Sequence, residues 1–307
     1  MDDTQKSNPL VHIIVLTWNE YNDTVECLES LGKINYSNYK IILVDNGSRD
    51  GSIQKLRERF GKDEKVRIIA NEKNLGFAGG NNVGIKYAMN KGADAVLLIN
   101  NDTIVDPNFL TELVKAEKEN KQAGILGSKI YYEGDPKRIW SAGGKVSKLL
   151  TKGVHIGYDE IDNGQYDETK KRDYLTGCCL LIKKEVIKKI GVLSDDYFLY
   201  YEDTDYCLRA RKAGYDCLYI PASKIWHKVS RSSKPGSSSY IYYHTRNGLA
   251  MARRNGSPLI KFLTYLNCLF LFLKQIVKYV FMPAKRKWAV AVLEGERDFL
   301  LGRMGKK

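Results

Sequence analysis

Short apolar runs alternate with helical stretches along the first third of the chain, and this alternation constrains the fold more than any other feature. The runs are rich in β-branched residues and cover 11–17, 39–44, 66–70 and 96–99. Each is followed by a loop and then by a stretch with helical character. A repeated strand–loop–helix order is typical of a doubly wound parallel sheet. The sequence therefore predicts an α/β fold with helices flanking a central sheet.

Polar loops follow these predicted strands. Asn100, Asn101 and Asp102 come directly after the run at 96–99, and the loop 45–52 holds two carboxylates, two hydroxyls and two glycines. Ligands bind beyond the carboxyl ends of strands in open α/β sheets, so we expect a polar site at one edge. A carboxylate with neighbouring amides suits a hard divalent cation that keeps water and phosphate oxygens as ligands. Judged alone, each loop is explained equally well as ordinary turn chemistry.

Glycines at 76, 79 and 80 precede a predicted helix that runs to about Asn90. Glycines at a helix N-terminus let backbone N–H groups approach an anion, and the helix dipole adds to the attraction. The spacing does not match the Gly-x-Gly-x-x-Gly dinucleotide fingerprint, and no Gly-Lys-Ser or Gly-Lys-Thr of a P-loop is present. The segment therefore indicates phosphate binding of another kind.

Three acids open a later predicted helix, directly after an aromatic run. Glu202, Asp203 and Asp205 follow the aromatic-rich segment 197–201. Acids in a first turn are favoured by the helix dipole alone. An apolar wall beside a carboxylate, however, raises its pKa toward the working range of a general base. His227 stands just past another predicted strand, and the Ser/Lys-rich loop after it is interpreted either as a mobile cationic flap or as a solvated linker.

Composition limits the partners and the compartment. The net charge of +13 favours anionic partners, which include nucleotide phosphates, anionic lipid and nucleic acid. The six cysteines show no paired metal or redox spacing, so we interpret them as core residues in a reducing compartment. No apolar segment precedes Leu10, and we therefore expect no secretory signal and a cytoplasmic location.

The segment 258–283 is apolar and aromatic, with an uncharged core at 262–273. That core is shorter than the ~20 residues needed to span a bilayer. Lysines at 261, 274 and 278 suggest an amphipathic helix lying in the interface of an anionic membrane. The alternative is a helix buried against the rest of the protein.

Taken together, these pieces resemble family 2 of the inverting glycosyltransferases, and in particular its rhamnosyltransferase-like branch. No single piece is specific, but their order along the chain is. The matching segments are 16–19, 44–52, 74–82, 98–102, Gly177, 198–205, 211–215 and His227.

The resemblance implies a fold, a division of the chain and an activity. The fold is GT-A, a Rossmann-like and mostly parallel sheet with flanking helices, followed by an amphipathic helical appendage. Residues 1–250 would form the catalytic domain, with a nucleotide-sugar half at about 1–125 and an acceptor half at about 126–250. Residues 251–307 would form a helical, membrane-associating segment. The activity would be metal-assisted displacement of a sugar from a nucleoside diphosphate, with inversion, onto a hydroxyl of a glycan or lipid-linked acceptor.

The resemblance also assigns residues. Asp203 matches the general base, with Glu202 as the fallback. Asp102 and His227 match ligands of Mg²⁺ or Mn²⁺, although Asn100 replaces the first acid of the family's Asp-x-Asp motif. The residues expected to contact the nucleotide-sugar are Thr17, Asn19, Asp45, Asn46, Ser48, Asn74, Gly76, Gly79, Asn81, Asn101 and Arg231.

The partners implied are a donor such as dTDP-rhamnose or a UDP- or GDP-sugar, an acceptor of polysaccharide or cell-envelope synthesis, and an anionic membrane surface. Nucleic acid is not among them, and the enzyme is expected to lie on the inner face of the cell membrane. A sugar nucleotidyltransferase is the alternative. It would need a glycine-rich, Arg-containing loop after the first strand, where this chain has Thr17-Trp18-Asn19-Glu20.

Overall fold

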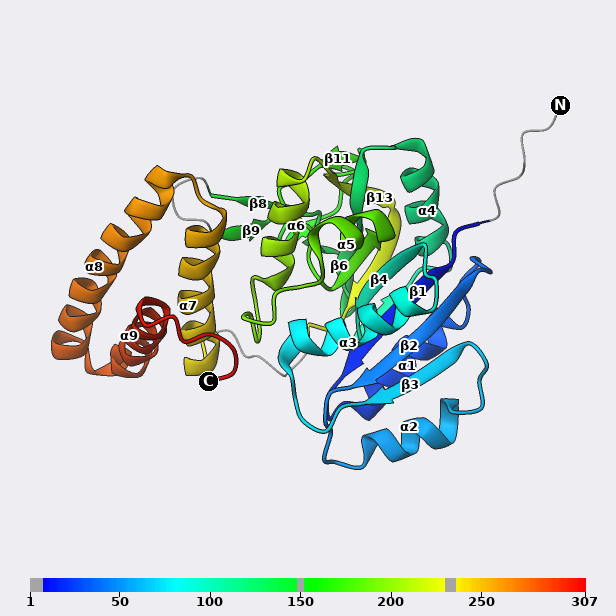
Figure 1. Cartoon of the computed structure of the whole chain (residues 1–307), viewed down its shortest axis with the longest axis horizontal. Coiled ribbons are helices and arrows are strands. Elements are labelled where there is room, and N and C mark those ends of the chain that lie inside the picture. Colours follow the sequence, from blue (N-terminus) through cyan, green and yellow to red (C-terminus); the bar gives the residue numbers. More distant parts are fainter. Residues whose placement is uncertain (1–7, 148–151, 230–235) are drawn as a thin grey trace.

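The computed structural model describes residues 8–147, 152–229 and 236–307 (Figure 1). Four parallel strands form the start of its main sheet, in the order β3-β2-β1-β4. They are β1 (Val11–Thr17), β2 (Tyr39–Asp45), β3 (Val66–Ala70) and β4 (Ala95–Asn100). These bounds confirm the strands predicted from the apolar runs.

Helices cover both faces of this sheet, as the alternation predicted (Figure 1). Val11, Ile13 and Val15 of β1 belong to one buried cluster, whereas Ile14 belongs to a second cluster on the opposite face. This alternation explains why the strands are apolar throughout, because both of their faces are buried. The flanking helices of this half are α1 (Tyr21–Leu31), α2 (Ser52–Phe60), α3 (Gly76–Asn90) and α4 (Phe109–Glu119).

The second half makes the sheet mixed. Strand β12 lies between β4 and β6 and is antiparallel to both, while β6 pairs in parallel with the long strand β13. The remaining elements of this half are β5 (Thr103–Val105), β6 (Ala123–Tyr132), β7 (Asp135–Ser141), β8 (Gly144–Val146), β9 (Gly153–His155), β10 (Glu160–Ile161), β11 (Lys170–Lys171), β12 (Cys179–Lys183), α5 (Lys184–Ile190), α6 (Glu202–Lys212) and β13 (Asp216–His227).

Helices at the C-terminus pack against one another beside the sheet domain and form the expected helical appendage (Figure 1). They are α7 (Ser238–Asn255), α8 (Pro258–Phe281), the short 3₁₀ turn η1 (Pro283–Lys285) and α9 (Arg286–Leu300). The boundary expected at residue 250 falls inside α7, which packs on both α8 and α9. The division into domains at that residue stays a prediction.

All six cysteines are free and buried, which agrees with their interpretation as core residues. Cys178 and Cys179 stand at the start of β12, where the second half of the fold joins the first.

Gly76 makes a close approach that the fold requires. It has φ of +77°, and a Cβ there would overlap the carbonyl oxygen of Phe198. Gly92 also has φ of +77°, but a Cβ there would meet nothing within 4 Å. We expect Gly92→Ala to cost about 1–2 kcal/mol of unfolding free energy, from backbone strain alone. Gly76→Ala should cost at least about 1–3 kcal/mol more because it adds a clash with backbone.

Urea unfolding followed by tryptophan fluorescence measures both variants. Equal losses for the two alanine variants would contradict the close approach of Gly76 to the segment that contains Phe198.

Candidate active site

The carboxyl ends of β1, β2 and β4 meet at one edge of the sheet. Thr17 is opposite Asp45 in the β1–β2 pairing, and Leu16 is opposite Asn100 in the β1–β4 pairing. The Asp45 carboxylate accepts a hydrogen bond of 3.2 Å from the Ser48 backbone N–H. The edge therefore collects the residues predicted to contact the nucleotide.

Thr17 and Asn101 are joined through Thr24. The two threonine hydroxyls lie 2.8 Å apart, and the Asn101 side-chain amide donates to the Thr24 hydroxyl at 3.0 Å. Nearby, the backbone N–H of Asn19 donates to the Ser48 hydroxyl at 2.8 Å, which ties the loop after β1 to the loop after β2.

Asn46 is buried and connects the loop after β2 to the loop between β3 and α3. Its side-chain N–H groups donate to the Asn74 side-chain oxygen at 3.2 Å and to the Gly76 carbonyl at 3.0 Å. Its side-chain oxygen accepts from the Leu75 N–H at 3.1 Å. These contacts use the amide inside the protein, so Asn46 shapes the edge of the site by holding its loops together.

The glycine-rich start of α3 faces the segment that precedes α6. The Phe77 N–H donates to the Phe198 carbonyl at 2.8 Å, and the Gly76 N–H donates to the Asn74 side chain at 2.8 Å. These two N–H groups are thus already hydrogen-bonded within the protein. A Cβ on Gly79 would lie 3.8 Å from Asp195, and the buried Asn81 donates to the Phe77 carbonyl at 2.9 Å.

Asp102 and His227 form a close pair. The Asp102 Oδ1 and His227 Nε2 atoms are 3.1 Å apart, and their side chains are only 6% and 7% exposed. The antiparallel pairing of β13 with β5 places His227 opposite Thr103 and so brings it beside Asp102. The Asn100 side-chain nitrogen lies 3.4 Å from the same ring nitrogen.

The Asp102–His227 pair has the donor chemistry of a divalent cation site. The Asp102 Oδ1 and His227 Nε2 atoms, 3.1 Å apart, have the spacing of two adjacent ligand atoms around an octahedral cation whose metal–ligand bonds are about 2.0–2.1 Å long. Among the described residues, no group of three or more His, Cys, Asp or Glu side chains could hold a metal ion. A cation here would take its remaining ligands from elsewhere.

Trp140 was missed by the sequence prediction. Its ring packs edge-on against His227 with centroids 4.7 Å apart, and it packs against His155 at the same distance. The His227 Nδ1 atom is buried and has no hydrogen-bond partner in the described structure, so Trp140 orients the imidazole by packing. Burial, followed by the charge of His227, lowers the pKa of His155 to about 4.

Asp203 is held by backbone amides. One carboxylate oxygen accepts from the Gly177 N–H at 2.8 Å, and the other accepts from the Thr204 N–H at 2.6 Å. Burial raises the pKa of Asp203, while these hydrogen bonds oppose the shift. Glu202 is more deeply buried, and its Oε2 atom has no hydrogen-bond partner within the described residues. Asp203 is the more accessible acid of the two.

Asp102, the predicted cation ligand, and Asp203, the predicted general base, both lie near the segment that contains Gly177 and Cys178. The Gly177 N–H contacts Asp203, and the next carbonyl, that of Cys178, accepts from the Asn100 N–H at 3.1 Å. Burial raises the pKa of the Cys178 thiol well above its usual value, and the charges of Asp102 and Asp203 both add to the shift. Asp102 and Asp203 therefore lie at one shared edge of the sheet.

Comparisons with known proteins identify the family. The sequence model of the family described as "Glycosyl transferase family 2" matches residues 12–191, more than half of the chain. The chain belongs to glycosyltransferase family 2.

Characterised and uncharacterised relatives resemble this glycosyltransferase. It is 31% identical over 242 residues to the uncharacterised protein y4gI of Sinorhizobium fredii, covering 74% of this chain but only 25% of that longer protein. It is 24% identical to the dTDP-rhamnosyl transferase RfbF of Shigella flexneri, covering 82% of this chain and 83% of RfbF. It is 25% identical to an N-acetylglucosaminyl-diphospho-decaprenol L-rhamnosyltransferase of Mycobacterium tuberculosis, covering 76% and 81% of the two chains.

A solved structure shows the same fold. The mannosyltransferase PcManGT of Pyrobaculum calidifontis, solved in complex with GDP-Man and Mn²⁺, superimposes with a TM-score of 0.61. The match covers 97% of this chain and 89% of PcManGT at 14% sequence identity. The glycosyltransferase therefore has the expected GT-A fold.

The turn before Glu202 is strained. Tyr200 and Tyr201 have φ of 69° and 72°, a left-handed conformation that non-glycine residues rarely adopt. Each costs of order 1–3 kcal/mol, and such strain clusters at functional sites. The aromatic run that suggested an apolar wall thus also sets an unusual backbone at the start of α6.

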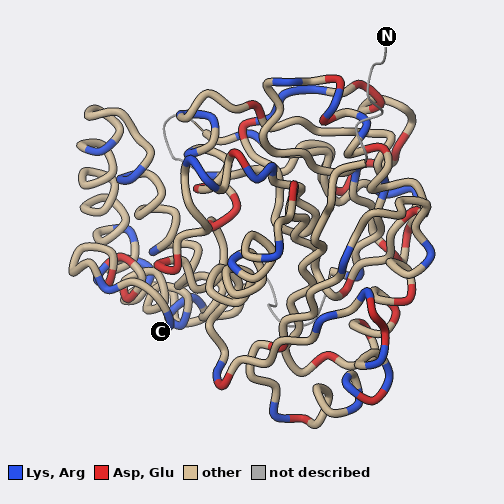
Figure 2. The backbone as a smooth tube through the Cα atoms, turned by 45° about the vertical axis from the view of Figure 1, so that its right-hand side comes forward, with Lys and Arg blue, Asp and Glu red and all other residues tan. Residues whose placement is uncertain are grey.

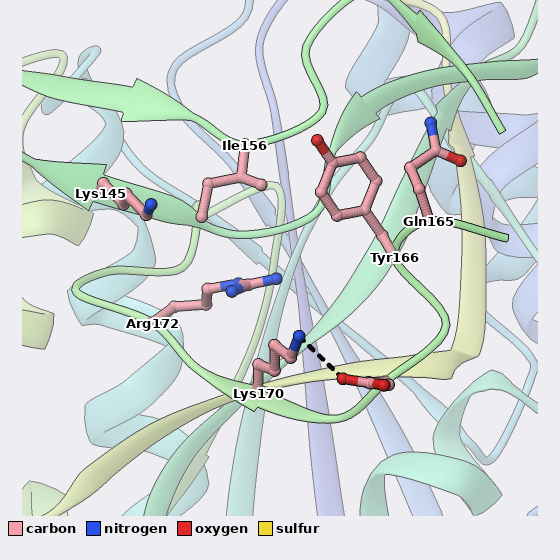
Figure 3. A pocket seen from close by; sticks show the side chains of 7 residues that line it. Lys145, Ile156, Gln165, Tyr166, Lys170 and Arg172 are labelled. Carbon is pink, nitrogen blue, oxygen red and sulfur yellow. Dashed lines mark ion pairs between the residues drawn. The ribbon is translucent and has the colours of Figure 1, made fainter. Parts of the chain in front are cut away.

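Arg231, predicted to contact the donor, lies outside the described residues. Figure 3 shows a basic cavity of about 240 Å³, in which Lys170 pairs with Glu168 at 2.8 Å. None of the predicted site residues lines it; the lining residues are Lys145, Ile156, Gln165, Tyr166, Glu168, Lys170 and Arg172.

Glu202→Gln should stabilise the glycosyltransferase at neutral and higher pH. Burial, followed by the charge of Asp203, raises the pKa of Glu202 well above its ordinary value. The raised pKa of Glu202 therefore lowers the free energy of unfolding at high pH, where the carboxylate must be buried with its charge. This loss of stability disappears as the pH falls toward the ordinary pKa that Glu202 has in the unfolded chain. We expect the melting temperature of Glu202→Gln to exceed that of the wild type by about 2–4 °C at pH 8, with a smaller gain at pH 5.

Asp205→Asn is the matched control, measured by the same thermal unfolding. Asp205 is equally buried but accepts from Arg209 at 2.9 Å, so its neutralisation should lower the melting temperature. A loss of stability in both variants would contradict the uncompensated burial of Glu202.

Proposed function

We propose that this glycosyltransferase transfers a sugar, with inversion, from a nucleoside-diphosphate donor to a hydroxyl of a glycan or lipid-linked glycan. The observation that supports the proposal is that Asp102 and Asp203 lie at one edge of the sheet. Asp102 follows the end of β4, and Asp203 accepts a hydrogen bond from Gly177 just before β12, where the Cys178 carbonyl accepts from the Asn100 N–H of β4. Asp102 would then hold the cation that binds the leaving diphosphate, and Asp203 would take the proton from the acceptor hydroxyl.

Asp203 acts as the general base. As the acceptor oxygen attacks the anomeric carbon, its proton passes to an Asp203 carboxylate oxygen and the bond from that carbon to the diphosphate breaks. A pKa raised by burial makes the carboxylate a stronger base at neutral pH. Glu202, which is more deeply buried, keeps only the fallback role.

Asp102 and His227 would hold the divalent cation, Mg²⁺ or Mn²⁺. When bound, it would supply positive charge to the leaving diphosphate. Their 3.1 Å separation supports this assignment, and the presence of Mn²⁺ and GDP-Man in the PcManGT complex agrees with it. Because Asn100 replaces the family's first acid, the site carries one negative charge fewer.

The donor proposal follows the relatives' names. RfbF is named a dTDP-rhamnosyl transferase and the M. tuberculosis relative acts on a decaprenol-linked sugar, so we favour a deoxysugar donor and a lipid-linked acceptor of cell-envelope polysaccharide synthesis. The matched family gives no support to the alternative, a sugar nucleotidyltransferase.

Helix α8 is the proposed membrane contact on the inner face of the cell membrane. It is 24 residues long, apolar enough to cross a membrane by length and composition, and only 17% of its most apolar window is buried. Its inward stripe is small or polar, with Thr264, Cys268 and Gln275 buried. Its outward side exposes large apolar side chains, among them Leu259, Phe262, Leu266, Leu269, Phe270, Leu273, Val277 and Phe281.

An interfacial position fits α8 better than a spanning one. Its inward stripe packs on α7 and α9, and α9 carries several charged residues. Figure 2 shows the helices at the left edge as tan with a few blue segments, and Lys261 and Lys274 interrupt the exposed apolar surface. Lysines at the edge of an apolar face suit an anionic lipid surface, whereas the interface of a second copy would bury them.

Asp203→Asn tests the base. We expect the rate of transfer to fall by roughly 10²–10⁴-fold, because the amide cannot accept the acceptor's proton, while nucleotide binding stays intact. Single-turnover transfer measures the rate, calorimetry measures nucleotide binding, and NMR of the product reports the anomeric inversion. A near-normal single-turnover rate would overturn the role of Asp203, and retention of configuration would overturn the displacement mechanism.

Asp102→Asn should give the complementary result. It leaves the base in place but removes the charged cation donor, so Mn²⁺ should no longer strengthen nucleotide binding in calorimetry. Unchanged Mn²⁺ dependence in this variant would remove Asp102 from the cation site.

The membrane contact is tested with Phe270→Glu combined with Leu273→Glu, two positions that are 61% and 56% exposed. We expect the wild type to sediment with phosphatidylglycerol vesicles and the double variant to bind at least about tenfold more weakly, because charges on the apolar face resist burial in lipid. Val154→Glu, at a site that is 60% exposed on β9, is the control and should bind normally. Equal vesicle binding by all three proteins would contradict membrane contact through α8. A wild-type dimer in light scattering that becomes a monomer in the double variant would instead show that α8 contacts a second copy of the chain.

A further inference from the structure

We propose that Asn247 of α7 is a positioning residue for the general base, which makes the C-terminal helices part of the active site as well as a membrane contact. The inference rests on the proposed role of Asp203. It starts from the left-handed residues Tyr200 and Tyr201, which lead directly into the helix that carries Asp203.

Asn247 holds the backbone of this turn. Its side-chain nitrogen donates to the Leu199 carbonyl at 2.7 Å and to the Tyr200 carbonyl at 3.1 Å. A side-chain amide has two N–H hydrogens, so both are used on the turn. The Asn247 side chain is fully buried.

The Asn247 side chain is itself fixed by a hydrogen bond to its own oxygen. The Nε of buried Arg246 donates to the Asn247 side-chain oxygen at 3.0 Å. The Arg246 guanidinium is anchored in turn on the Gly305 carbonyl at 2.8 Å and on the Tyr242 hydroxyl at 3.2 Å. The chain of contacts therefore runs from the C-terminal segment through α7 to the strained turn.

Helix α7 also contacts the start of α6 through other residues. The Asn255 side chain donates to the Asp205 carboxylate at 2.7 Å. The His244 ring also packs on Tyr200 and Tyr201, with centroid distances of 4.4 and 5.4 Å. Contacts at residues 199–201 and at Asp205 bracket Asp203 on both sides.

This bracket determines where Asp203 lies. A left-handed turn is unfavourable for residues with a Cβ, so without its donors the turn relaxes toward ordinary backbone angles. The first turn of α6 would then shift and the hydrogen bond from Gly177 to Asp203 would lengthen. A small displacement of a catalytic group is enough to slow a reaction by up to about 10²-fold.

The test uses Asn247→Ala in the full-length protein. We expect kcat for sugar transfer to fall by about 10–100-fold, with the donor KM changed less than about twofold. We also expect the acidic limb of the pH–rate profile to move, because the hydrogen bonds that set the pKa of Asp203 change. Asn255→Ala, at a partly exposed residue, should give a smaller loss of kcat of the same kind.

Thr264→Ala is the control. Thr264 is buried in α8, and its hydroxyl donates to the Ile260 carbonyl of the same helix at 2.8 Å, so its loss destabilises the helical unit without touching the turn. It should lower the melting temperature while kcat and the pH profile stay at wild-type values. Equal losses of kcat in Asn247→Ala and Thr264→Ala would reduce Asn247 to a structural residue.

Hydrogen exchange gives a readout that does not depend on activity. The Gly177 amide, bonded to Asp203, should exchange about tenfold faster in Asn247→Ala and at the wild-type rate in Thr264→Ala. An unchanged Gly177 amide together with wild-type kcat would overturn the inference. If Asp203→Asn is inactive while Asn247→Ala is normal, the positioning role fails and the proposed function stands; a fully active Asp203→Asn instead defeats the proposed function.

Discussion

Parallel pairing of β1 with β2 and β4 is the constraint on which the site depends. It places Thr17 opposite Asp45 and Leu16 opposite Asn100. The polar residues at the ends of the three strands therefore lie side by side at one edge of the sheet. Since the strands are buried on both faces, their register is fixed by the two apolar clusters that sandwich them. The polar residues at the ends of these strands therefore take their positions from the packing of the core.

The antiparallel strand β12 adds the second half of the site to this edge. The residues at its start make two hydrogen bonds: the Gly177 N–H donates to Asp203, and the carbonyl of the adjacent Cys178 accepts from the Asn100 N–H. A parallel strand at this position would enter from the opposite end of the sheet. The reversed direction of β12 thus brings Asp203, through Gly177, to the same edge of the sheet as Asp102, which follows β4.

Local sequence patterns were sufficient to predict the strands and loops that carry the site, but they did not predict the contacts between those elements. The apolar runs predicted β1 to β4 closely, and the polar residues after them were correctly expected at a common edge. The direction of β12 was not predicted, because the order of strands in a sheet depends on contacts far apart in sequence. Trp140 was missed for the same reason, since nothing near it marks a ring that packs on His227, 87 positions later.

Burial and strain are concentrated where the chemistry is proposed. The Oε2 atom of Glu202 is buried with no hydrogen-bond partner among the described residues, burial raises the pKa of Asp203, and the two tyrosines before them adopt left-handed backbone. None of these features stabilises the fold, so the surrounding packing must offset their cost. Much of that packing comes from α7, which is itself supported by α8 and α9. Through Asn247 of α7, a helical unit with an outward apolar face thus contacts the left-handed turn that leads into the helix carrying Asp203.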